Sequence, residues 1–528
     1  MIETKTLPNE VNALKTLLAE HYQRHAQLEN AHQHALQRNA QLEARVLSLQ
    51  EQLNLALAHR YAARSEKISA DQLRLFDEAE VDRDTAQDER TDTDEAITVA
   101  AHTRNKKRGR QPLPDTLPRI DIVHELGEAD RVCDHDGAVL TDIGEVISEQ
   151  LDIIPAKIQV IRHIRKKYAC ACGRCIKTAP LPKQPIPKSL ASPGLLAHIA
   201  VSKYQDALPL HRQEIILQRI GVDIPRATLA NWMIHTGTLI QPIINLLRDH
   251  LLAYDIIQMD ETTVQVLRED HKTAQSKSYL WVQRGGPPHQ PIVLFDYDPS
   301  RSQTVPQRLL QDFKGYLQTD GYEGYHAVVQ HNHLAHVGCF AHARRKFTEA
   351  LKAQGKHKIH GIAHHFLELI QQLYKIEKAV RNATPDERHA YRQQHAAPTL
   401  KKIRDHLDKS VPQVPPQSTL GKALYYLDHQ WYKLLRYLDD GRLEIDNNRT
   451  ENAIRPFVIG RKNWLFSHSV KGVNASANLY SLIETAKANG LEPYAYLRYL
   501  FSTLPNATSV DDIERLLPFN LTADQLKI

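Results

Sequence analysis

The chain has 528 residues, of which 42% are hydrophobic, and its formal net charge is +5. A chain of this length can bury several hydrophobic cores, so we expect two to four domains. No apolar run approaches the roughly 18 residues that span a bilayer, and the N-terminus lacks the apolar stretch of a signal peptide. These features point to the cytoplasm, and we expect a soluble, cytoplasmic protein without a membrane partner.

A heptad pattern of apolar residues runs from residue 11 to residue 57, with Leu14, Leu42 and Leu49 at one of its two seam positions. Such a pattern is typical of a coiled coil, and we expect it to join copies of the chain into a homo-oligomer. Polar residues in the seam, such as His21 and Asn39, weaken it and could fix the register. The alternative is a single long helix packed on its own protein.

Residues 76 to 96 are acidic and nearly devoid of apolar side chains, which predicts a disordered linker. A basic segment follows, and its core, Arg108-Gly109-Arg110, suits the narrow minor groove of A·T-rich DNA. The alternative is a solvated basic linker that makes no DNA contact.

Four of the five cysteines fall within one short stretch, which in a cytosolic protein favours metal binding over disulfides. The segment CGRC has the two-residue spacing of half a tetrahedral zinc site, with one more cysteine as a competing ligand. The other half is ambiguous, since it offers one cysteine and then a histidine or Asp136. We expect zinc to stabilise a small strand-rich module here, and the alternative is a relic that no longer holds metal. The candidate ligands are Cys133, His135, Cys170, Cys172 and Cys175.

An all-helical stretch is predicted from Ser192 to about Leu252. Its centre shows a helix, a turn at Gly221 with Pro225, and a second helix through Trp232. This is the layout of a helix-turn-helix, whose second helix could enter a major groove of DNA. The alternative is a helical hairpin that only packs within the protein.

The pattern then changes to α/β. A helix is predicted at 303–313, and strands are predicted at 255–260, 279–284, 291–297, 315–319 and 336–340. Three antiparallel strands, a helix and two more strands match the start of a ribonuclease-H-like fold. Residues 348 to 440 look helical throughout and would interrupt that fold. At the turn from the last strand to this helical region, Cys339 and His342 have the spacing of half a zinc site, which we interpret as structural.

Three carboxylates are candidates for a two-metal site. Asp260 and Asp320 are each predicted to close a strand, and Glu451 lies on a polar helical face with Arg455 one turn further on. Phosphodiester chemistry with two magnesium ions requires converging carboxylates, because each ion takes oxygen ligands. For any one of these residues alone, a surface charge or a helix cap would be the alternative, as Asp446 illustrates.

Basic and aromatic residues around these carboxylates are candidates for DNA contacts. Arg455 and Lys462 could face a scissile phosphate, Trp464 could stack on a base, and the basic group after His342 could meet DNA phosphates. The alternatives are an ion pair between Glu451 and Arg455, a tryptophan in the core, and an exposed helix face. The DNA-binding candidates are Arg108, Arg110, Arg344, Arg345, Arg455, Arg461, Lys462 and Trp464.

We therefore predict a multi-domain α+β protein. Its expected parts are a coiled coil (1–65), an acidic then basic linker (66–118), a zinc-finger-like module (119–185), a helix-turn-helix DNA-binding region (186–250), a ribonuclease-H-like catalytic domain (251–470) with a helical insertion (348–440), and a C-terminal helical segment (471–528).

With these residues assembled, the chain resembles the transposases of bacterial insertion sequences, and among them the IS66 family. The resemblance extends nearly from end to end of the chain. The motifs that carry it are Arg108 to Pro114, Lys167 to Cys170, Met259-Asp260-Glu261-Thr262, Asp320-Gly321-Tyr322, Cys339 with His342, Glu444 to Glu451, Gly460 to Trp464 and Tyr480 to Lys487.

The resemblance implies that Asp260, Asp320 and Glu451 are a DDE triad that holds two magnesium ions, with manganese as a substitute. It also implies a function, which is to bind the terminal inverted repeats of an element, cut their 3′ ends and join them to target DNA. Accessory proteins of the same element are implied partners. The chain departs from the family at Asp136, where a second cysteine is usual, and this weakens the inherited zinc site.

Two other functions compete with this one. A DNA-binding protein without catalytic activity would need the same binding modules but not three converging carboxylates. A ribonuclease-H-like nuclease would need the carboxylates but not the binding modules. Metal-dependent joining of a cut end to new DNA separates a transposase from both.

Overall fold

A computed structural model describes residues 10–61, 158–169, 176–353 and 361–526 of the chain. It divides into two compact units, residues 86–182 and the remainder. The predicted acidic linker, Arg108, Arg110 and all five candidate zinc ligands lie outside the described residues, so those predictions stay predictions.

The N-terminal heptad segment forms one continuous helix, α1 (Val11–Tyr61). Its apolar side chains are exposed, for example Leu28 at 66% and Leu42 at 56%. Pairing of this helix with a second copy therefore remains a prediction. In the smaller unit, β1 (Lys167–Ala169) and β2 (Ile176–Thr178) pair as antiparallel strands with Tyr168 opposite Lys177.

Four helices follow. They are α3 (Pro193–Tyr204), α4 (Leu210–Arg219), α5 (Arg226–Leu239) and α6 (Gln241–Ala253). The Ser192 hydroxyl accepts a hydrogen bond from the Leu195 amide and so caps α3. The chain turns between α4 and α5 at Gly221, whose φ of +82° lies in the left-handed region that favours glycine. The predicted helix, turn and helix are thus present.

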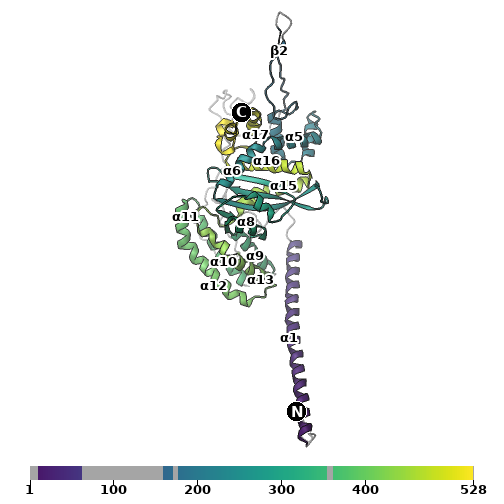
Figure 1. Ribbon diagram of the computed structural model, residues 1–528, viewed down its shortest axis with the longest axis vertical. Helices are drawn as coiled ribbons and strands as arrows, with labels where there is room; N and C mark the ends of the chain where they lie inside the picture. Colours follow the sequence, from purple (N-terminus) through teal and green to yellow (C-terminus); the bar gives the residue numbers. More distant parts are fainter. Residues whose placement is uncertain (1–9, 62–157, 170–175, 354–360, 527–528) are drawn as a thin grey trace, which may run out of the picture. The chain divides into compact units, whose positions relative to one another are not determined.

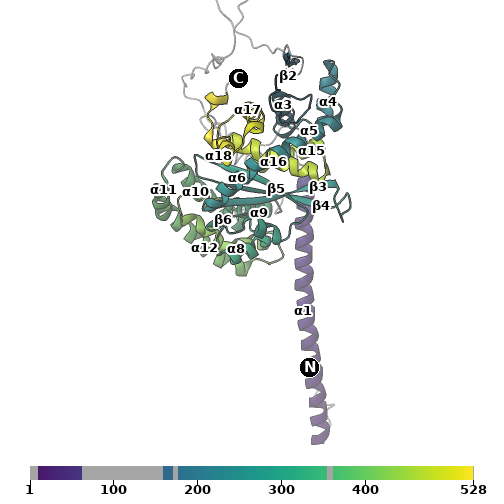
Figure 2. The same cartoon turned by 45° about the horizontal axis from the view of Figure 1, so that its top comes forward.

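One mixed sheet forms the centre of the larger unit (Figures 1 and 2). Its strand order is β5-β4-β3-β6-β7, and β8 also pairs with β3. The strands β3, β4 and β5 are antiparallel, whereas β6 and β7 run parallel to β3. The bounds are β3 (Ile256–Arg268), β4 (Lys277–Gly285), β5 (Ile292–Asp298), β6 (Tyr316–Gln318), β7 (Ala335–Val337) and β8 (Ser467–Ser469).

The prediction that Asp260 closes its strand is wrong, because β3 continues to Arg268. The polar run Glu261-Thr262-Thr263 interrupts the apolar pattern, but these residues still pair with β4, and the pairing extends as far as Gln265 opposite Lys277. The pairing partner, and not the apolar pattern, keeps this stretch extended. Asp260 therefore lies inside the central strand.

Helices connect and cover these strands. Between β5 and β7 lie α7 (Thr304–Leu309), η3 (Glu323–Tyr325) and α8 (His326–Asn332). A helical region with its own hydrophobic core follows β7. Its elements are α9 (Phe340–Ala353), α10 (Ile362–Ala379), α11 (Pro385–Tyr391), the π-helical turn η4 (Arg392–Ala396), α12 (Ala397–Ser410), η5 (Val411–Gln413), α13 (Thr419–His429), α14 (Trp431–Leu435) and η6 (Arg436–Leu438).

Buried Arg392 ties this helical region to the chain that returns to the sheet. Its guanidinium pairs with Glu377 at 2.7 and 2.8 Å. It also donates to the carbonyl oxygens of Tyr437, Asp440 and Leu443. These carbonyls belong to the segment that leads into the helix with Glu451, so the buried guanidinium of Arg392 holds this segment in place.

The C-terminal part adds α15 (Asn448–Trp464), α16 (Val470–Ala488), α17 (Pro493–Thr503), η7 (Leu504–Asn506), α18 (Val510–Glu514), η8 (Pro518–Asn520) and η9 (Ala523–Leu526). Helix α16 packs along β5, the edge strand of the sheet. The Ser481 hydroxyl accepts from the Phe295 amide at 2.7 Å, and the Thr485 hydroxyl bonds both the amide and the carbonyl of Val293. These hydroxyls satisfy backbone groups that an uncovered edge would expose. No helix within the described ranges combines the length and apolar character needed to cross a membrane.

Candidate active site

Two buried glutamines set the geometry of the site. Gln258 on β3 and Gln318 on β6 are direct register partners of the parallel pair. Gln258 Nε2 donates to Gln318 Oε1 at 2.7 Å, and Gln258 Oε1 accepts from the Thr450 hydroxyl of α15 at 3.0 Å. Gln318 in turn donates to the carbonyl oxygens of Gly338 and Glu444 at 3.2 and 2.8 Å. This chain of hydrogen bonds joins β3, β6 and the start of α15.

The three candidate carboxylates are attached to this network. Asp260 follows Gln258 by two residues on β3, so these two side chains share a face of the strand. Asp320 follows Gln318 by two residues, just past the end of β6. Glu451 directly follows Thr450 in the first turn of α15. The register of two strands and one helix start therefore brings together residues that are up to 191 positions apart, since 451 − 260 = 191.

Asp320 lies just past the end of β6, where the chain turns sharply. Gly321 adopts a φ of +96°, which a residue with a side chain rarely does. The turn lets the Tyr322 amide donate to Asp320 Oδ1 at 2.9 Å, and the Tyr426 hydroxyl donates to the Asp320 carbonyl at 2.6 Å. The orientation of Asp320 is thus set from both sides.

The edge of β3 beside Asp260 is not covered by another strand. The strand β6 pairs with residues 256–258 of β3, and β8 pairs with Val266 and Arg268. Between them, Asn447 Nδ2 donates to the Met259 carbonyl at 3.1 Å, and Arg461 Nη1 donates to the Thr263 carbonyl. Side chains from α15 and the turn before it thus occupy the edge of β3 between β6 and β8, which is the stretch that contains Asp260.

The charges of the candidate carboxylates are poorly compensated by the protein. The pKa of Asp260 is raised well above its usual value, first by burial and then by the charges of Glu261, Asp320 and Glu451. Oε1 of Glu451 is buried and has no hydrogen-bond partner among the described residues. Mutual repulsion and an unsatisfied carboxylate oxygen are the expected marks of a site that binds a cation.

The cationic side chains near Glu451 compensate it only partly. His342 Nε2 lies 3.7 Å from Glu451 Oε1, and Arg345 Nη2 lies 3.5 Å from Oε2. Burial lowers the pKa of His342 and outweighs the opposite effect of Glu451, which keeps the imidazole neutral near pH 7. Arg345 is 46% exposed, so solvent screens its attraction.

The donor set fits a hard divalent cation. Three carboxylates offer the oxygen ligands that magnesium and manganese prefer. In the described ranges, however, no three acidic, histidine or cysteine side chains stand close enough together to hold a metal ion as they are. The carboxylates would have to close around the ion, as mutually repelling groups do when a cation neutralises them.

The predicted DNA contacts that the structure describes differ in their exposure to solvent. Lys462 is exposed, and Arg345 is partly exposed beside Glu451. Arg344 lies over the Tyr374 ring at 5.9 Å, and Arg455 is half-buried on α15.

Arg461 and Trp464 serve the packing of α15. Arg461 bonds β3, as described above, and Trp464 makes an edge contact with Phe457 and lies under Lys203. Their proposed contacts with DNA are therefore less direct than those of the exposed basic residues.

Several residues of the site were not identified from the sequence. No sequence pattern marks Gln258, Gln318 or Thr450 as site residues, because only the register of the strands makes them hydrogen-bond partners. Glu261 stands beside Asp260, yet its role depends on Arg301, 40 residues away, whose Nε donates to Glu261 Oε1 at 2.7 Å. The thiol of Cys339 is buried and accepts from the Asn447 amide, as expected of a structural residue.

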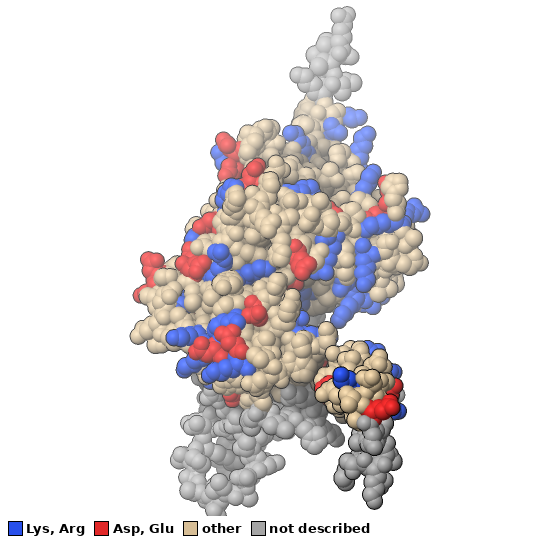
Figure 3. All heavy atoms as spheres, turned by 60° about the horizontal axis from the view of Figure 1, so that its bottom comes forward, with Lys and Arg blue, Asp and Glu red and all other residues tan. Residues whose placement is uncertain are grey.

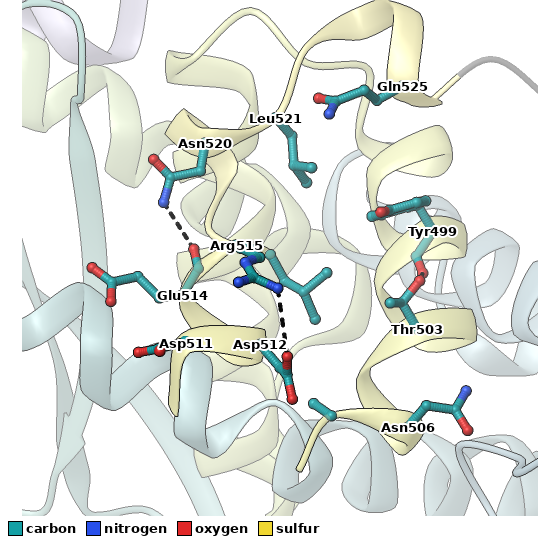
Figure 4. Close-up of a pocket in the computed structure, with 12 residues that line it drawn as sticks. Tyr499, Thr503, Asn506, Asp511, Asp512, Glu514, Arg515, Asn520, Leu521 and Gln525 are labelled. Carbon is teal, nitrogen blue, oxygen red and sulfur yellow. Dashed lines mark hydrogen bonds and ion pairs between the residues drawn. The ribbon is translucent and has the colours of Figure 1, made fainter. Parts of the chain in front are cut away.

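A separate pocket of about 700 Å³ lies among the C-terminal helices α17 and α18 (Figure 4). Arg515 faces Asp512 there at 3.7 Å, and Asn520 donates to the Glu514 carbonyl at 2.8 Å. Two pairs of its lining residues are thus engaged with each other, and it contains none of the three candidate carboxylates.

Comparisons with known proteins agree on one family. The family model described as "Transposase IS66 family" matches residues 188–475, and the "IS66 C-terminal element" matches 481–519. The "zinc-finger binding domain of transposase IS66" matches 130–173, and a model described as "Transposase C of IS166 homeodomain" matches 48–122.

Curated relatives from Sinorhizobium fredii cover most of the chain. The protein y4jD, described as uncharacterized, is 33% identical over 446 residues, which is 80% of this chain and 86% of that protein. A second uncharacterized protein, y4qI, is 32% identical over 80% of this chain and 79% of its own length.

Proposed function

Because this chain belongs to the transposase IS66 family, we propose that it is a metal-dependent transposase with Asp260, Asp320 and Glu451 as its catalytic triad. It binds the terminal inverted repeats of an insertion sequence, cuts their 3′ ends and joins them to target DNA. The observation that supports this proposal is the register pairing of Gln258 with Gln318, whose hydrogen bonds link β3, β6 and the start of α15, and each proposed triad residue lies within two residues of this network.

The proposed fold of the catalytic domain is ribonuclease-H-like. Supporting it are the strand order β5-β4-β3-β6-β7, with three antiparallel strands followed by two parallel ones, and the helical region that separates Asp320 from Glu451. We assign the catalytic domain to residues 251–470 and its insertion to 348–440.

Two successive reactions at phosphorus make up the proposed activity. In the first, water attacks the phosphodiester at the element end, and the 3′ oxygen of the element leaves as a hydroxyl. In the second, that hydroxyl attacks a phosphodiester of target DNA and displaces a target 3′ oxygen. Magnesium or manganese, when bound, would supply positive charge to the attacking and leaving oxygens.

The protein's own residues hold and orient the reacting groups. Asp260, Asp320 and Glu451 would hold the metal ions. His342, neutral near pH 7, stands beside Glu451 and can accept or donate a proton at Nε2. Arg345 stands next to Glu451 with its guanidinium partly exposed, where it can contact a DNA phosphate.

The remaining modules would bind DNA and partner molecules. Figure 3 shows lysine and arginine side chains gathered in a band along one side of the body, as a surface that tracks a phosphate backbone requires. We propose that α4 and α5 form a DNA-binding helix-turn-helix, that the cysteine module binds zinc, and that α1 joins copies of the chain. Accessory proteins of the same element remain proposed partners, and the reaction would take place on DNA in the bacterial cytoplasm.

The test is an end-joining assay. Purified protein is incubated with a labelled duplex from the DNA that flanks its reading frame and with a target plasmid, in magnesium or in EDTA. We expect joined products in magnesium only, and none with Glu451→Gln, which keeps the size of the side chain but removes its charge. Arg404→Gln, which alters an ion pair in the helical region, should join like the wild type. Equal joining by the wild type and Glu451→Gln would refute the triad, and specific binding without joining would favour a DNA-binding protein.

A further inference from the structure

A second polar cluster lies next to the candidate triad and is not used by it. Glu261 follows Asp260 on β3, so its side chain points to the opposite face of the sheet. There its side chain is 2% exposed, and both carboxylate oxygens accept hydrogen bonds. The Tyr325 hydroxyl donates to Oε2 at 2.7 Å, and Arg301 Nε donates to Oε1 at 2.7 Å.

Arg301 is held in one orientation by three contacts. Besides its bonds to Glu261, its guanidinium lies 3.9 Å from the centroid of the Tyr322 ring. The Tyr322 hydroxyl donates to the Arg301 carbonyl at 2.8 Å, which fixes the ring relative to the arginine backbone. An arginine that is already ordered loses little conformational entropy when it binds a ligand.

The same tyrosine connects Arg301 to the triad. The Tyr322 amide donates to Asp320 Oδ1 at 2.9 Å. Asp320 also contributes to raising the pKa of Glu261, after the larger effect of burial, so the two carboxylates are within electrostatic range. Arg301 therefore lies within electrostatic range of Asp320, one member of the candidate triad.

The guanidinium has donors to spare. Its side chain is 42% exposed, and its hydrogen bonds to Glu261 use Nε and Nη2. In the part of the chain that the structure describes, Nη1 makes no hydrogen bond. A purely structural partner for Glu261 would be buried with it, as Arg392 is buried with Glu377.

We propose that Arg301 is a phosphate-binding residue that grips the DNA backbone beside the scissile bond, with Glu261 and Tyr322 as its positioning residues. The ligand is a single phosphodiester, and the planar fork of the guanidinium suits its two free oxygens. This inference rests on the proposed function, because it requires a DNA strand beside Asp320.

The test couples a change in the protein to a change in the DNA. Duplexes of the flanking DNA are made with one methylphosphonate, an uncharged substitute, at each phosphate near the element end in turn. Binding of wild type and Arg301→Gln is then measured for every duplex in magnesium. We expect one phosphate whose neutralisation weakens wild-type binding about tenfold and hardly affects Arg301→Gln.

Two further variants sharpen the result. Arg301→Lys keeps the charge that Glu261 needs for folding but loses the fork and the stacking, so it should show a severalfold smaller effect at that same phosphate. Arg404→Gln is the matched control, since Arg404 also pairs with carboxylates, lies over an aromatic ring and is 33% exposed. It should respond like the wild type at every phosphate.

Equal sensitivity of the wild type and both Arg301 variants at all phosphates would overturn the inference. The measurement needs no turnover, so it is independent of the joining assay. A coupled phosphate without joining would support the Arg301 site and refute the transposase activity. Joining without any coupled phosphate would support the transposase activity and refute the Arg301 site.

Discussion

Replacing Gln318 by leucine tests whether the buried glutamine pair positions the triad. Gln318 is 1% exposed, and leucine has nearly its volume without its amide. The change removes the hydrogen bonds to Gln258, Gly338 and Glu444 and leaves their polar atoms buried. At about 1 to 2 kcal/mol for each unsatisfied group, we expect a loss of about 4 kcal/mol in the free energy of unfolding.

The effect on the site separates positioning from stability. Asp320 lies two residues beyond Gln318, so a looser β6 should bring the carboxylates together less well. Magnesium stabilises a folded protein to which it binds, and its effect appears as a rise in thermal midpoint relative to EDTA. We expect magnesium to raise the thermal midpoint of the wild type and not that of Gln318→Leu. A magnesium titration of the folded protein, well below the melting temperature of the variant, should likewise show binding to the wild type only.

Gln213→Leu provides the matched control. Gln213 is also buried, at 4% exposure, and donates to the carbonyls of Ile199 and Leu208 in the helical region before the sheet. This variant should lose about 2 to 3 kcal/mol in urea unfolding and keep the magnesium effect. If Gln318→Leu also keeps that effect, or if it costs less than about 1 kcal/mol, the glutamine pair does not position the triad.

Three further predictions concern buried charges. Arg392→Met should lower the free energy of unfolding by about 3 to 5 kcal/mol, because it leaves Glu377 and three carbonyls without their partner; a cost below about 1 kcal/mol in urea unfolding would contradict this. Burial raises the pKa of Asp446 from its usual value of 3.8 to about 6. Between these two pH values the folded state keeps a proton that the unfolded state has released, so the free energy of unfolding falls as the pH rises from about 4 to about 6. Asp446→Asn lacks this fall, and its free energy of unfolding relative to the wild type should rise by about 3 kcal/mol between about pH 4 and about pH 7; a constant difference would refute the assignment. Asp260→Asn removes a buried charge that neighbouring carboxylates repel, so in EDTA at alkaline pH its free energy of unfolding should exceed that of the wild type by about 1 to 3 kcal/mol, and magnesium should not stabilise it. A variant less stable than the wild type would mean that the protein compensates the charge of Asp260.

The local elements of this chain follow largely from local signals. The turn at Gly221, the helices around it and the strands β4, β5 and β6 lie where apolar periodicity and turn residues predict them, within a few residues. The prediction fails at β3, because Glu261-Thr262-Thr263 has no apolar pattern. Those residues are extended since β4 pairs with them, and no local signal contains that partner.

The candidate site divides in the same way. Asp260, Asp320 and Glu451 can be selected from the sequence by residue type, by their place near strands and a helix, and by the family motifs around them. Arg301 cannot, because it has no motif and stands 40 residues from the glutamate that binds it. The contact of Arg461 with the uncovered edge of β3 has no local signal either, because its guanidinium bonds the Thr263 carbonyl, which is 198 residues away in the chain.

The sequence alone determined most of the helical and extended segments, the family that the chain resembles and the carboxylates to test, since these depend on residues close together in the chain. Only the tertiary structure decided the register that pairs Gln258 with Gln318, the gap between β6 and β8, and the partners of Glu261 and Arg392. Those features depend on contacts between residues far apart in the chain, and each contact exists only when the whole sheet and its covering helices have formed.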